Sequence, residues 1–257
     1  MGESTAKRIG SVPYLNSVPL TCGIEAKTEF LTPSRLAKRL RSGELVAGLV
    51  SITEVLFNDL YDVLDGVAVA SDGPVKSVFV AHKKPIEQVE VIHCDTASLS
   101  SVNLLKVTLA KRGLSPRLES FGDYNHAADL DAVLLIGNPG IEFLRLPHEH
   151  QILDLGQAWR EDTGLPFVFA VWAIRRDQHL PGLGQALLQA KQDGLAKLDE
   201  IIATYPEFDA GLRFAYLREH IHYDLGDREK QGIAHFVERL RAVTDETVYE
   251  PKYIAGF

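Results

Sequence analysis

The chain has 257 residues, of which 46% are hydrophobic and 24% are charged, and its formal net charge is −8. A chain of this length can bury one large core or two lobes of about 100–130 residues each. The negative charge argues against nucleic acids and acidic membrane surfaces as partners.

The chain has two cysteines, Cys22 and Cys94, which form neither a disulfide framework nor a zinc motif. They are typical of reduced thiols in the cytosol. The first eight residues hold no apolar stretch typical of a signal sequence, and no run approaches the roughly 20 apolar residues of a membrane span. We therefore expect a cytoplasmic protein that does not bind membranes.

Strand and helix signals alternate along the first part of the chain. An apolar-leaning strand at 9–12 runs into a loop, after which Pro19 offers a helix start. Pro33 begins a helix that Gly43 ends. Further elements follow, with a turn at 72–74 before the last of them: strands at 45–50, 67–70 and 75–81, and a helix beginning at 52–57.

A second unit begins with a strand at 89–94, followed by a helix at 98–112 that Gly113 ends. The pattern then predicts a short strand around Leu118 and two buried strands, at 132–136 and 166–174. The remainder is helical, with an apolar stripe over 183–202 and helices at 208–219 and 230–243. This alternation predicts an α/β fold.

The same pattern predicts two lobes joined by a two-strand hinge. The chain would leave the first lobe near 81–85 and return near 173–177, where strands end in polar or proline residues. Lobe 1 then comprises 1–82 and 175–257, and lobe 2 comprises 83–174. A ligand would bind in the cleft between the lobes.

The loop after the first strand carries Tyr14 and Asn16. Ligands of open α/β sheets bind at the carboxyl ends of strands, which is where this loop lies. An amide is no general base at neutral pH, so Asn16 would recognise polar groups or stabilise developing charge. The other interpretation is a plain strand-to-helix connection with a buried tyrosine.

Hydroxyl side chains follow three other strands or turns. Ser77 comes after the turn at 72–74, as a candidate catalytic residue or a solvated strand hydroxyl, and Ser51 directly follows the strand at 45–50. The turn at 95–101 opens a helix, so its free N–H groups and the helix dipole favour an anion. One N-cap needs a single hydroxyl, whereas this turn offers four candidate substrate contacts, Thr96, Ser98, Ser100 and Ser101.

A glycine and an amide, Gly137 and Asn138, follow the strand at 132–136. A glycine at a strand end allows the backbone to approach a ligand closely, or simply makes a turn. We take both residues as candidate substrate contacts.

Motifs for cofactors and metals are missing from the sequence. It contains no Gly-x-Gly-x-x-Gly run and no phosphate-loop signature, which argues against nucleotide cofactors. It contains no nucleophile elbow. The histidine pairs 148/150 and 220/222 are spaced too closely for a helical zinc site. We expect neither a cofactor nor a metal.

Together these segments resemble the chorismate dehydratases of the futalosine route to menaquinone. The matching pieces occur in family order and cover most of 8–175, whereas the helical tail matches only in pattern. The family usually has an aspartate where Asn138 stands and a threonine where Leu99 stands. The matching runs are SVPYLNSVPL at 11–20, DGPVKSV at 72–78, the hydroxyl-rich turn at 95–101, LLIG at 134–137, and 154–172 with TGLPFVFAVW.

The resemblance implies a two-lobed type II periplasmic-binding-protein-like fold that serves as an enzyme. The reaction would convert chorismate, a small anionic substrate, to 3-[(1-carboxyvinyl)oxy]benzoate and water without a cofactor. Asn16 and Ser77 would be catalytic, and the other candidate residues, Tyr14 and Ser51 included, would bind substrate.

These motifs contain no obvious general base. Glu54 lies close to Ser51, but a glutamate in the first turn of a helix is more often a dipole partner. The side-chain carboxylate of chorismate is an alternative base, with Asn16 steering it.

Two other functions fit many of the same features. A non-catalytic solute-binding protein for a small organic anion would share the fold, the cleft and the anion-binding turn, but the sequence lacks a secretory leader. A dihydroxynaphthoate synthase, the sister enzyme of the pathway, would share the fold, but its N-terminal loop motif differs.

Overall fold

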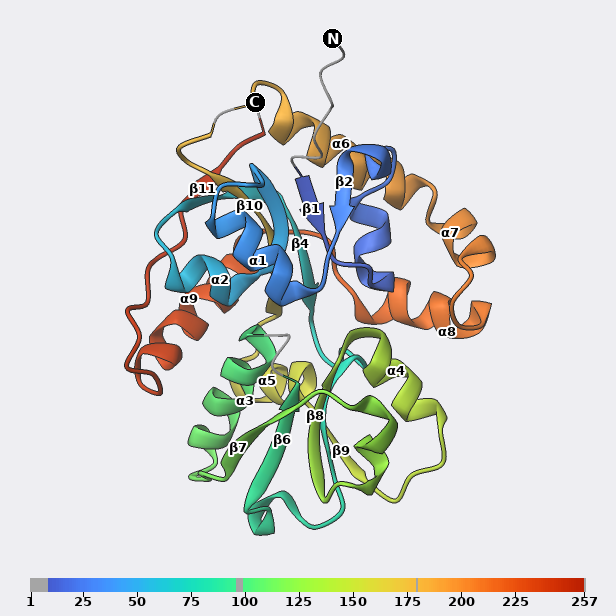
Figure 1. The fold of residues 1–257 in the computed structure, drawn as a ribbon, viewed down its shortest axis with the longest axis vertical. Helices are drawn as coiled ribbons and strands as arrows, with labels where there is room; N and C mark the ends of the chain where they lie inside the picture. The colour runs from blue at the N-terminus through green and yellow to red at the C-terminus, as the bar shows by residue number, and fades with distance from the viewer. Residues whose placement is uncertain (1–8, 96–98, 179, 257) are drawn as a thin grey trace.

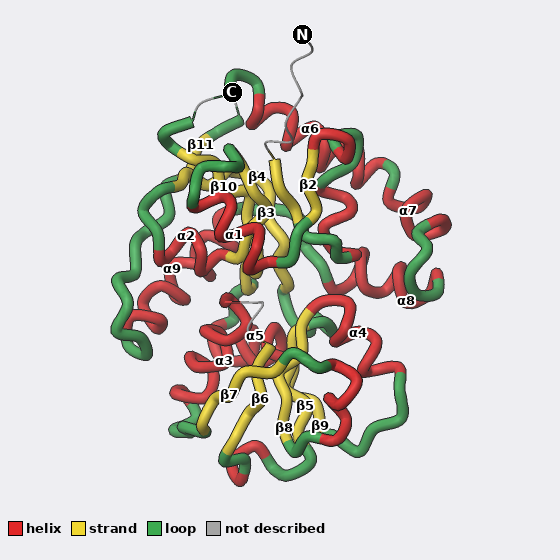
Figure 2. The backbone as a smooth tube through the Cα atoms, viewed as in Figure 1, coloured by secondary structure: helices red, strands yellow, loops and turns green. Residues whose placement is uncertain are grey.

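The computed structural model describes residues 9–95, 99–178 and 180–256, and it shows two α/β lobes, one above the other in Figure 1. Each lobe is built on one sheet (Figure 2). The upper sheet has the strand order β11-β4-β10-β3-β1-β2, and the lower sheet has the order β7-β6-β8-β5-β9. The upper strands are β1 (Ile9–Ser11), β2 (Thr28–Phe30), β3 (Ala47–Ser51), β4 (Tyr61–Ser71), β10 (Phe167–Arg175) and β11 (Tyr253–Ile254). The lower strands are β5 (Val78–His82), β6 (Val91–Asp95), β7 (Arg117–Phe121), β8 (Ala132–Ile136) and β9 (Gln151–Asp154).

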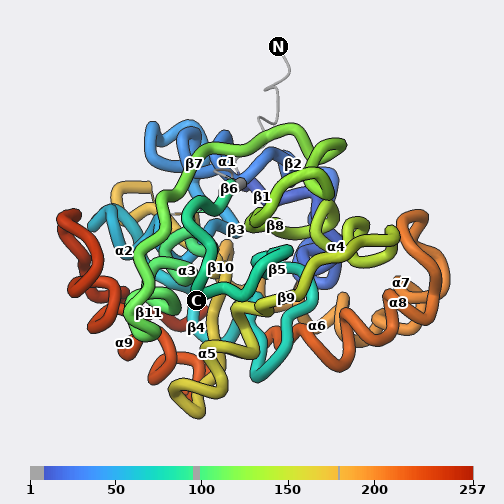
Figure 3. The backbone as a smooth tube through the Cα atoms, turned by 90° about the horizontal axis from the view of Figure 1, so that it is seen from below, coloured from blue at the N-terminus to red at the C-terminus, as the bar shows by residue number. Residues whose placement is uncertain are grey.

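Helices surround both sheets, and α9 lies on the opposite side of the molecule from α7 and α8 (Figure 3). In the described ranges, no helix is long and apolar enough to cross a membrane. The upper lobe contains η1 (Leu15–Leu20), η2 (Glu25–Lys27), α1 (Pro33–Arg41), α2 (Ile52–Phe57), α6 (Leu183–Ala196), α7 (Leu198–Thr204), α8 (Ala210–Phe214), η5 (Ala215–His220) and α9 (Asp227–Arg241). The lower lobe contains η3 (Ile86–Gln88), α3 (Leu99–Lys111), η4 (Tyr124–Asp129), α4 (Gly137–Arg145) and α5 (Leu155–Thr163).

The chain crosses between the lobes twice, between Ser71 and Val78 and again between Thr163 and Phe167. The crossings leave neighbouring strands, because Ser71 pairs with Phe167 where β4 runs antiparallel to β10. The predicted two-lobed α/β fold is therefore confirmed.

The lobe boundaries predicted after residues 82 and 174 differ from those that the sheets define. β5 belongs to the lower sheet and β10 to the upper sheet, so the crossings lie at 72–77 and 164–166. The polar segments 81–85 and 173–177 lie at the ends of these strands that face away from the other lobe. A strand has polar residues at both ends, and its sequence does not show which end meets the hinge.

Four local predictions are also corrected by the structure. Pro19 lies inside the 3₁₀ helix η1 instead of starting a helix, and residues 75–77 belong to the first crossing instead of a strand. Residues 137–140, for which a turn was one of two interpretations, begin α4, where Pro139 suits the first helical turn because its missing N–H has no partner there. The predicted helix at 208–219 is divided into α8 and the π-helix η5.

An aromatic cluster stabilises the second crossing. The Trp159 ring of α5 lies 5.4 Å from that of Phe167 and 6.0 Å from that of Phe236 on α9, centroid to centroid. The indole Nε1 of Trp159 donates to the carbonyl oxygen of Pro166 at 3.1 Å. These contacts join elements of both lobes at one buried point, since Trp159 and Phe236 are almost fully buried.

Helix α6 packs tightly against η1, the helix that carries Asn16. A Cβ atom added at Gly194 would lie 1.9 Å from the carbonyl oxygen of Pro19 and 2.7 Å from its Cα. Only glycine permits this approach, so Gly194 determines how deeply η1 sits.

We therefore expect Gly194→Ala to displace η1 and to lower the free energy of unfolding by about 1–3 kcal/mol, the usual cost of overpacking. Denaturant titration measures this change. Gly211→Ala is the matched control, because Gly211 is an exposed helical glycine whose added Cβ would meet only Asp209 Oδ1 at 3.4 Å. That variant should be neutral or more stable by up to about 1 kcal/mol. Equal effects in the two variants would contradict the tight packing.

Candidate functional site

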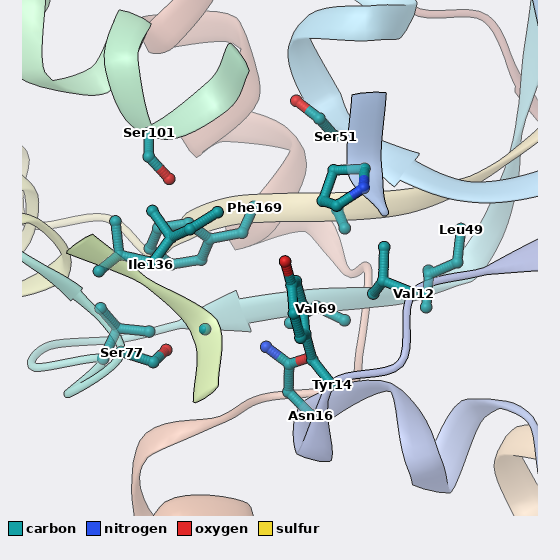
Figure 4. A pocket seen from close by; sticks show the side chains of 15 residues that line it. Val12, Tyr14, Asn16, Leu49, Ser51, Val69, Ser77, Ser101, Ile136 and Phe169 are labelled. Carbon is teal, nitrogen blue, oxygen red and sulfur yellow. The ribbon is translucent and has the colours of Figure 1, made fainter. Parts of the chain in front are cut away.

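A cavity lies between the lobes, at the ends of strands from both sheets (Figure 4). Its volume is about 80 Å³. Its walls are mostly aliphatic, formed by Val12, Pro33, Leu49, Val69, Val75, Val78, Ile136, Phe169 and Ala170 beside Gly137. The polar side chains that line it are Tyr14, Asn16, Ser51, Ser77 and Ser101. None of these described lining residues is charged.

The loop before η1 is held by Ser17, whose side chain is buried. Its hydroxyl lies 2.6 Å from the carbonyl oxygen of Val12 and 2.7 Å from that of Tyr14. These short contacts close the turn between β1 and η1. Tyr14 and Asn16, which both belong to this closed turn, extend into the cavity as Figure 4 shows.

Asn16 and Ser77 are joined through a third residue, Tyr216 of η5. Asn16 Nδ2 donates to the Tyr216 hydroxyl at 3.1 Å, and that hydroxyl donates to Ser77 Oγ at 2.8 Å. The two residues predicted to be catalytic therefore lie in one hydrogen-bonded line, although 61 positions separate them in the chain.

Tyr216 is almost fully buried. Burial raises the pKa of its hydroxyl to about 12, although the hydrogen bonds with Ser77 and Asn16 oppose the shift. The phenol therefore stays protonated at neutral pH and remains a hydrogen-bond donor. The π-helical turn that carries it is a rare geometry that is frequent at functional sites.

Ser77 is held in place by Asp154, the N-cap of α5. The Asp154 carboxylate accepts from the backbone N–H of Val75 at 3.1 Å and of Lys76 at 2.8 Å, and it also caps α5 through Gln157 N at 3.0 Å. Lys76 has φ +61°, a left-handed conformation that costs a non-glycine residue about 1 kcal/mol or more. The carboxylate compensates for this strain and so fixes the direction of the following residue.

Gly137 packs against the Tyr14 ring and does not leave its N–H to a ligand. Its N–H donates to the carbonyl oxygen of Ser77 at 2.7 Å, and its φ is +59°. An added Cβ would lie 3.3 Å from three atoms of the Tyr14 ring. The glycine thus brings the start of α4 against the loop of the upper lobe.

Hydroxyl groups of the two lobes meet beside the cavity. Ser100 Oγ on α3 lies 2.5 Å from Ser51 Oγ and 2.8 Å from Thr53 Oγ1, and it accepts from Thr53 N at 3.2 Å. Ser100 N donates to Ser51 Oγ at 3.1 Å. The first turns of α2 and α3 therefore face one another across the cleft, with three hydroxyls between them.

The rest of the serine-rich turn is only partly described. Ser101 is buried and lines the cavity, and Figure 4 shows its hydroxyl pointing into it. Thr96 and Ser98 lie outside the described residues. Their predicted substrate contacts stay predictions.

Asn138 connects the lobes and does not line the cavity. Its Oδ1 accepts from Leu15 N at 3.3 Å, and its Nδ2 donates to the carboxylate of Glu207, in the loop between α7 and α8. Arg145 on the same helix lies 3.7 Å from Asp209, so α4 contacts this loop twice. Both ends of the Asn138 amide are thus occupied by the upper lobe.

Glu54, the acid close to the predicted anion site, forms an ion pair. Its carboxylate is fully buried and receives two hydrogen bonds from Arg41, at 3.0 and 2.6 Å. Tyr61 donates to it at 2.9 Å and Asn58 at 3.2 Å. The hydrogen bond with Glu54 raises the pKa of Arg41, although burial opposes the shift.

Two histidines, His148 and His150, lie side by side in the lower lobe, and neither lines the cavity. The His148 and His150 rings lie 6.0 Å apart, and burial lowers the pKa of His150. Within the described ranges, no group of three or more histidine, cysteine, aspartate or glutamate residues has metal-binding geometry.

The sequence model of the menaquinone biosynthesis family matches residues 7–242. The chain belongs to that family. A curated relative, the chorismate dehydratase of Thermus thermophilus, is 32% identical over 259 residues, which span 89% of this chain and 95% of that protein.

Solved structures confirm the type II periplasmic-binding-protein fold. A protein from Archaeoglobus fulgidus superposes with a TM-score of 0.74 at 18% identity, over 94% of this chain and 98% of its own. The periplasmic aliphatic sulphonate-binding protein SsuA of Escherichia coli gives a TM-score of 0.62 at 17% identity, over 99% and 95% of the two chains. At these identities the structures share the fold alone.

Sequence reasoning missed several site residues of this menaquinone biosynthesis protein. Tyr216 lies in the helical tail, 139 residues after Ser77, and nothing in its neighbourhood distinguishes it from a core tyrosine. Thr53 lies in a mostly apolar helix start, where a single threonine gives no sign of a binding role. Asp154 could have been found, because an aspartate before Leu155 and Gly156 is a strong N-cap signal.

We expect Asp154→Ala to lower the free energy of unfolding by about 1–2 kcal/mol through the lost cap. It should also lower kcat about tenfold, because two backbone N–H groups of the crossing lose their partner and Ser77 moves. Asp123→Ala is the control, since Asp123 also caps a helix of the lower lobe, through Asn125 N at 3.2 Å, far from the cavity. Loss of stability with unchanged kcat would show that Asp154 caps α5 but does not position Ser77 for the reaction.

A second expectation concerns the hydroxyl cluster. Ser100→Ala removes a partner from Ser51 and Thr53, so KM should rise about tenfold if one lost hydrogen bond to an ionised ligand group contributes about 1.4 kcal/mol or more. The exposed Ser115, replaced by Ala in the same lobe, should leave KM unchanged. An unchanged KM for Ser100→Ala would show that the hydroxyl cluster joins the lobes but does not bind the ligand.

Proposed function

We propose that the protein is a chorismate dehydratase, which converts chorismate to 3-[(1-carboxyvinyl)oxy]benzoate and water. The observation that carries the proposal is the similarity, over nearly the full length of both chains, to a chorismate dehydratase. The cavity supports it, because aliphatic walls surround a few uncharged hydrogen-bonding groups. Such a lining suits a carbocyclic ring with polar substituents.

The reaction removes the hydrogen at C3 and the hydroxyl at C4, and together these form water. The C3 proton is acidic because the resulting charge is conjugated with the ring carboxylate, and loss of the hydroxyl makes the ring aromatic. With so favourable a product, the enzyme has to stabilise developing charge and assist one proton transfer. Asn16 and Ser77 are our candidates for these contacts.

The base that takes the C3 proton would come from the substrate. The described lining has no charged side chain, and Glu54 is fully engaged with Arg41. We therefore assign the proton to the side-chain carboxylate of chorismate, which Asn16 would orient. The proton then leaves with the C4 hydroxyl as water, so no residue changes its net protonation state.

The ring carboxylate would bind at the hydroxyl cluster. Ser100 and Ser101 lie in the first turn of α3, a 13-residue helix whose positive end favours an anion. Binding there requires the lobes to part, because Ser51 and Thr53 now occupy the Ser100 hydroxyl.

The test is turnover by the purified protein. Chorismate with a chelator and no added cofactor should give an aromatic product lighter by one water, followed by absorbance and mass spectrometry. Binding of chorismate without conversion would instead support a solute-binding protein, the alternative that the binding-protein fold favours. Activity only on a later intermediate of the pathway would support the sister synthase.

Asn16→Leu should lower kcat by about 10²–10³, the usual effect of losing one charge-stabilising donor. Stability should change little, because the amide makes one hydrogen bond among the described residues, with Tyr216. Asn16→Asp separates two roles, since a carboxylate next to an anionic substrate inactivates if the donor is needed but is tolerated if an acceptor suffices. Full activity of Asn16→Leu would exclude a catalytic role for this side chain.

A further inference from the structure

The hydroxyl of Tyr216 has one hydrogen to donate and lone pairs with which to accept. The hydrogen goes to Ser77 Oγ at 2.8 Å, and the oxygen accepts from Asn16 Nδ2 at 3.1 Å. Tyr216 is 3% exposed and is not a lining residue of the cavity. It therefore bonds to both predicted catalytic residues from outside the cavity.

The direction of these bonds constrains Ser77. Because Ser77 Oγ already accepts a hydrogen from Tyr216, its own hydrogen has to be donated elsewhere. Among the described residues, no acceptor for that hydrogen is seen, and the side chain lines the cavity. The Ser77 hydroxyl is thus oriented to donate its hydrogen to a ligand in the cavity.

The same reasoning applies to Asn16. One N–H of its amide is used by Tyr216, which fixes the orientation of the amide group. The amide oxygen and the second N–H have no hydrogen-bond partner among the described residues. Both can then face a ligand in the cavity, which Asn16 lines.

We propose that Tyr216 is a positioning residue, which sets the hydrogen-bond direction at Ser77 and Asn16 so that Ser77 donates to the departing C4 oxygen of the substrate. This inference rests on the proposed function. As the C4–O bond breaks, negative charge grows on that oxygen, and a donor fixed in advance stabilises it without reorganising. The Ser77 proton is not transferred, because the water takes its second hydrogen from C3 of the substrate.

Burial supports this role across a wide pH range. The pKa of Tyr216, raised to about 12, keeps the phenol protonated below about pH 11. The donor to Ser77 is therefore present throughout the range in which the enzyme can be assayed. Wild-type kcat should show no change between pH 7 and 10 that depends on Tyr216.

The test compares Tyr216→Phe with Tyr223→Phe. Both tyrosines are at least 95% buried, but the Tyr223 hydroxyl has no hydrogen-bond partner in the described residues, so its loss controls for the chemical change alone. Tyr216→Phe should lower kcat by 10-fold to 100-fold, because Ser77 and Asn16 lose their fixed orientation. Tyr223→Phe should stay within twofold of the wild type.

A purely structural role for Tyr216 is separated by two further measurements. The Kd of the product should change less than threefold in Tyr216→Phe, because the departing oxygen is absent from the product. In a Ser77→Ala background, Tyr216→Phe should cost far less in kcat than it does alone, since its acceptor is already gone. Multiplicative losses in the double variant, or wild-type kcat in Tyr216→Phe, would overturn the inference.

The wild-type assay distinguishes the two possible failures. If the wild type does not dehydrate chorismate, the proposed function fails and this inference fails with it. If the wild type is active but Tyr216→Phe behaves like Tyr223→Phe, the function stands and only the role of Tyr216 is lost.

Discussion

The cleft depends on hydrogen bonds that polar groups of one lobe make with the other. Ser100 contacts Ser51 and Thr53 on one side, and Asn138 contacts Leu15 and Glu207 on the other. Each such bond contributes only about 1 kcal/mol net, because water replaces it when the lobes part. A bound ligand can therefore shift the equilibrium between the open and closed arrangements of the two lobes. An anion that takes over the hydroxyls of Ser100 and Ser51 would exchange one set of partners for stronger, charge-assisted ones.

The site is uncharged, although the proposed substrate carries two carboxylates. Its donors are hydroxyls, an amide and the first turn of α3, which attract an anion without placing a fixed cation against it. Glu54, an acid close to the hydroxyl cluster, is paired with Arg41, from which it receives two hydrogen bonds. A buried and unpaired carboxylate there would repel the substrate, so the ion pair on α1 and α2 preserves the field that the anion needs. The overall charge of −8 is a weaker influence, because salt screens charges beyond about 8–10 Å.

The sequence predicted much of the fold because its signals are local. Apolar runs of strand length marked β3, β5, β8 and β10, and ligand-binding side chains were sought where such runs end. That logic found Asn16, Ser51, Ser77 and Ser101, which all line the cavity. It placed both lobe boundaries one strand too late, because polar residues follow an apolar strand at both ends and do not show which end meets the hinge. The role of Asn138 as a ligand contact stays a prediction. In the described residues its side chain bonds to partners 123 and 69 positions away, which no local pattern reveals.

Tyr216 shows a further limit of local patterns and also how a binding cleft can become a catalytic one. A binding protein needs only to hold its ligand, whereas an enzyme must contact the transition state better than the substrate. Donors that are fixed in direction before the reaction meet this need, because they lose no free energy to reorientation when charge develops. In this chain two residues outside the cavity lining fix the donors in direction. The Tyr216 phenol, on a π-helical turn, bonds to Ser77, and the Asp154 carboxylate holds the strained crossing at Lys76. The aromatic product makes the overall reaction favourable, so the task of these contacts is to lower the barrier.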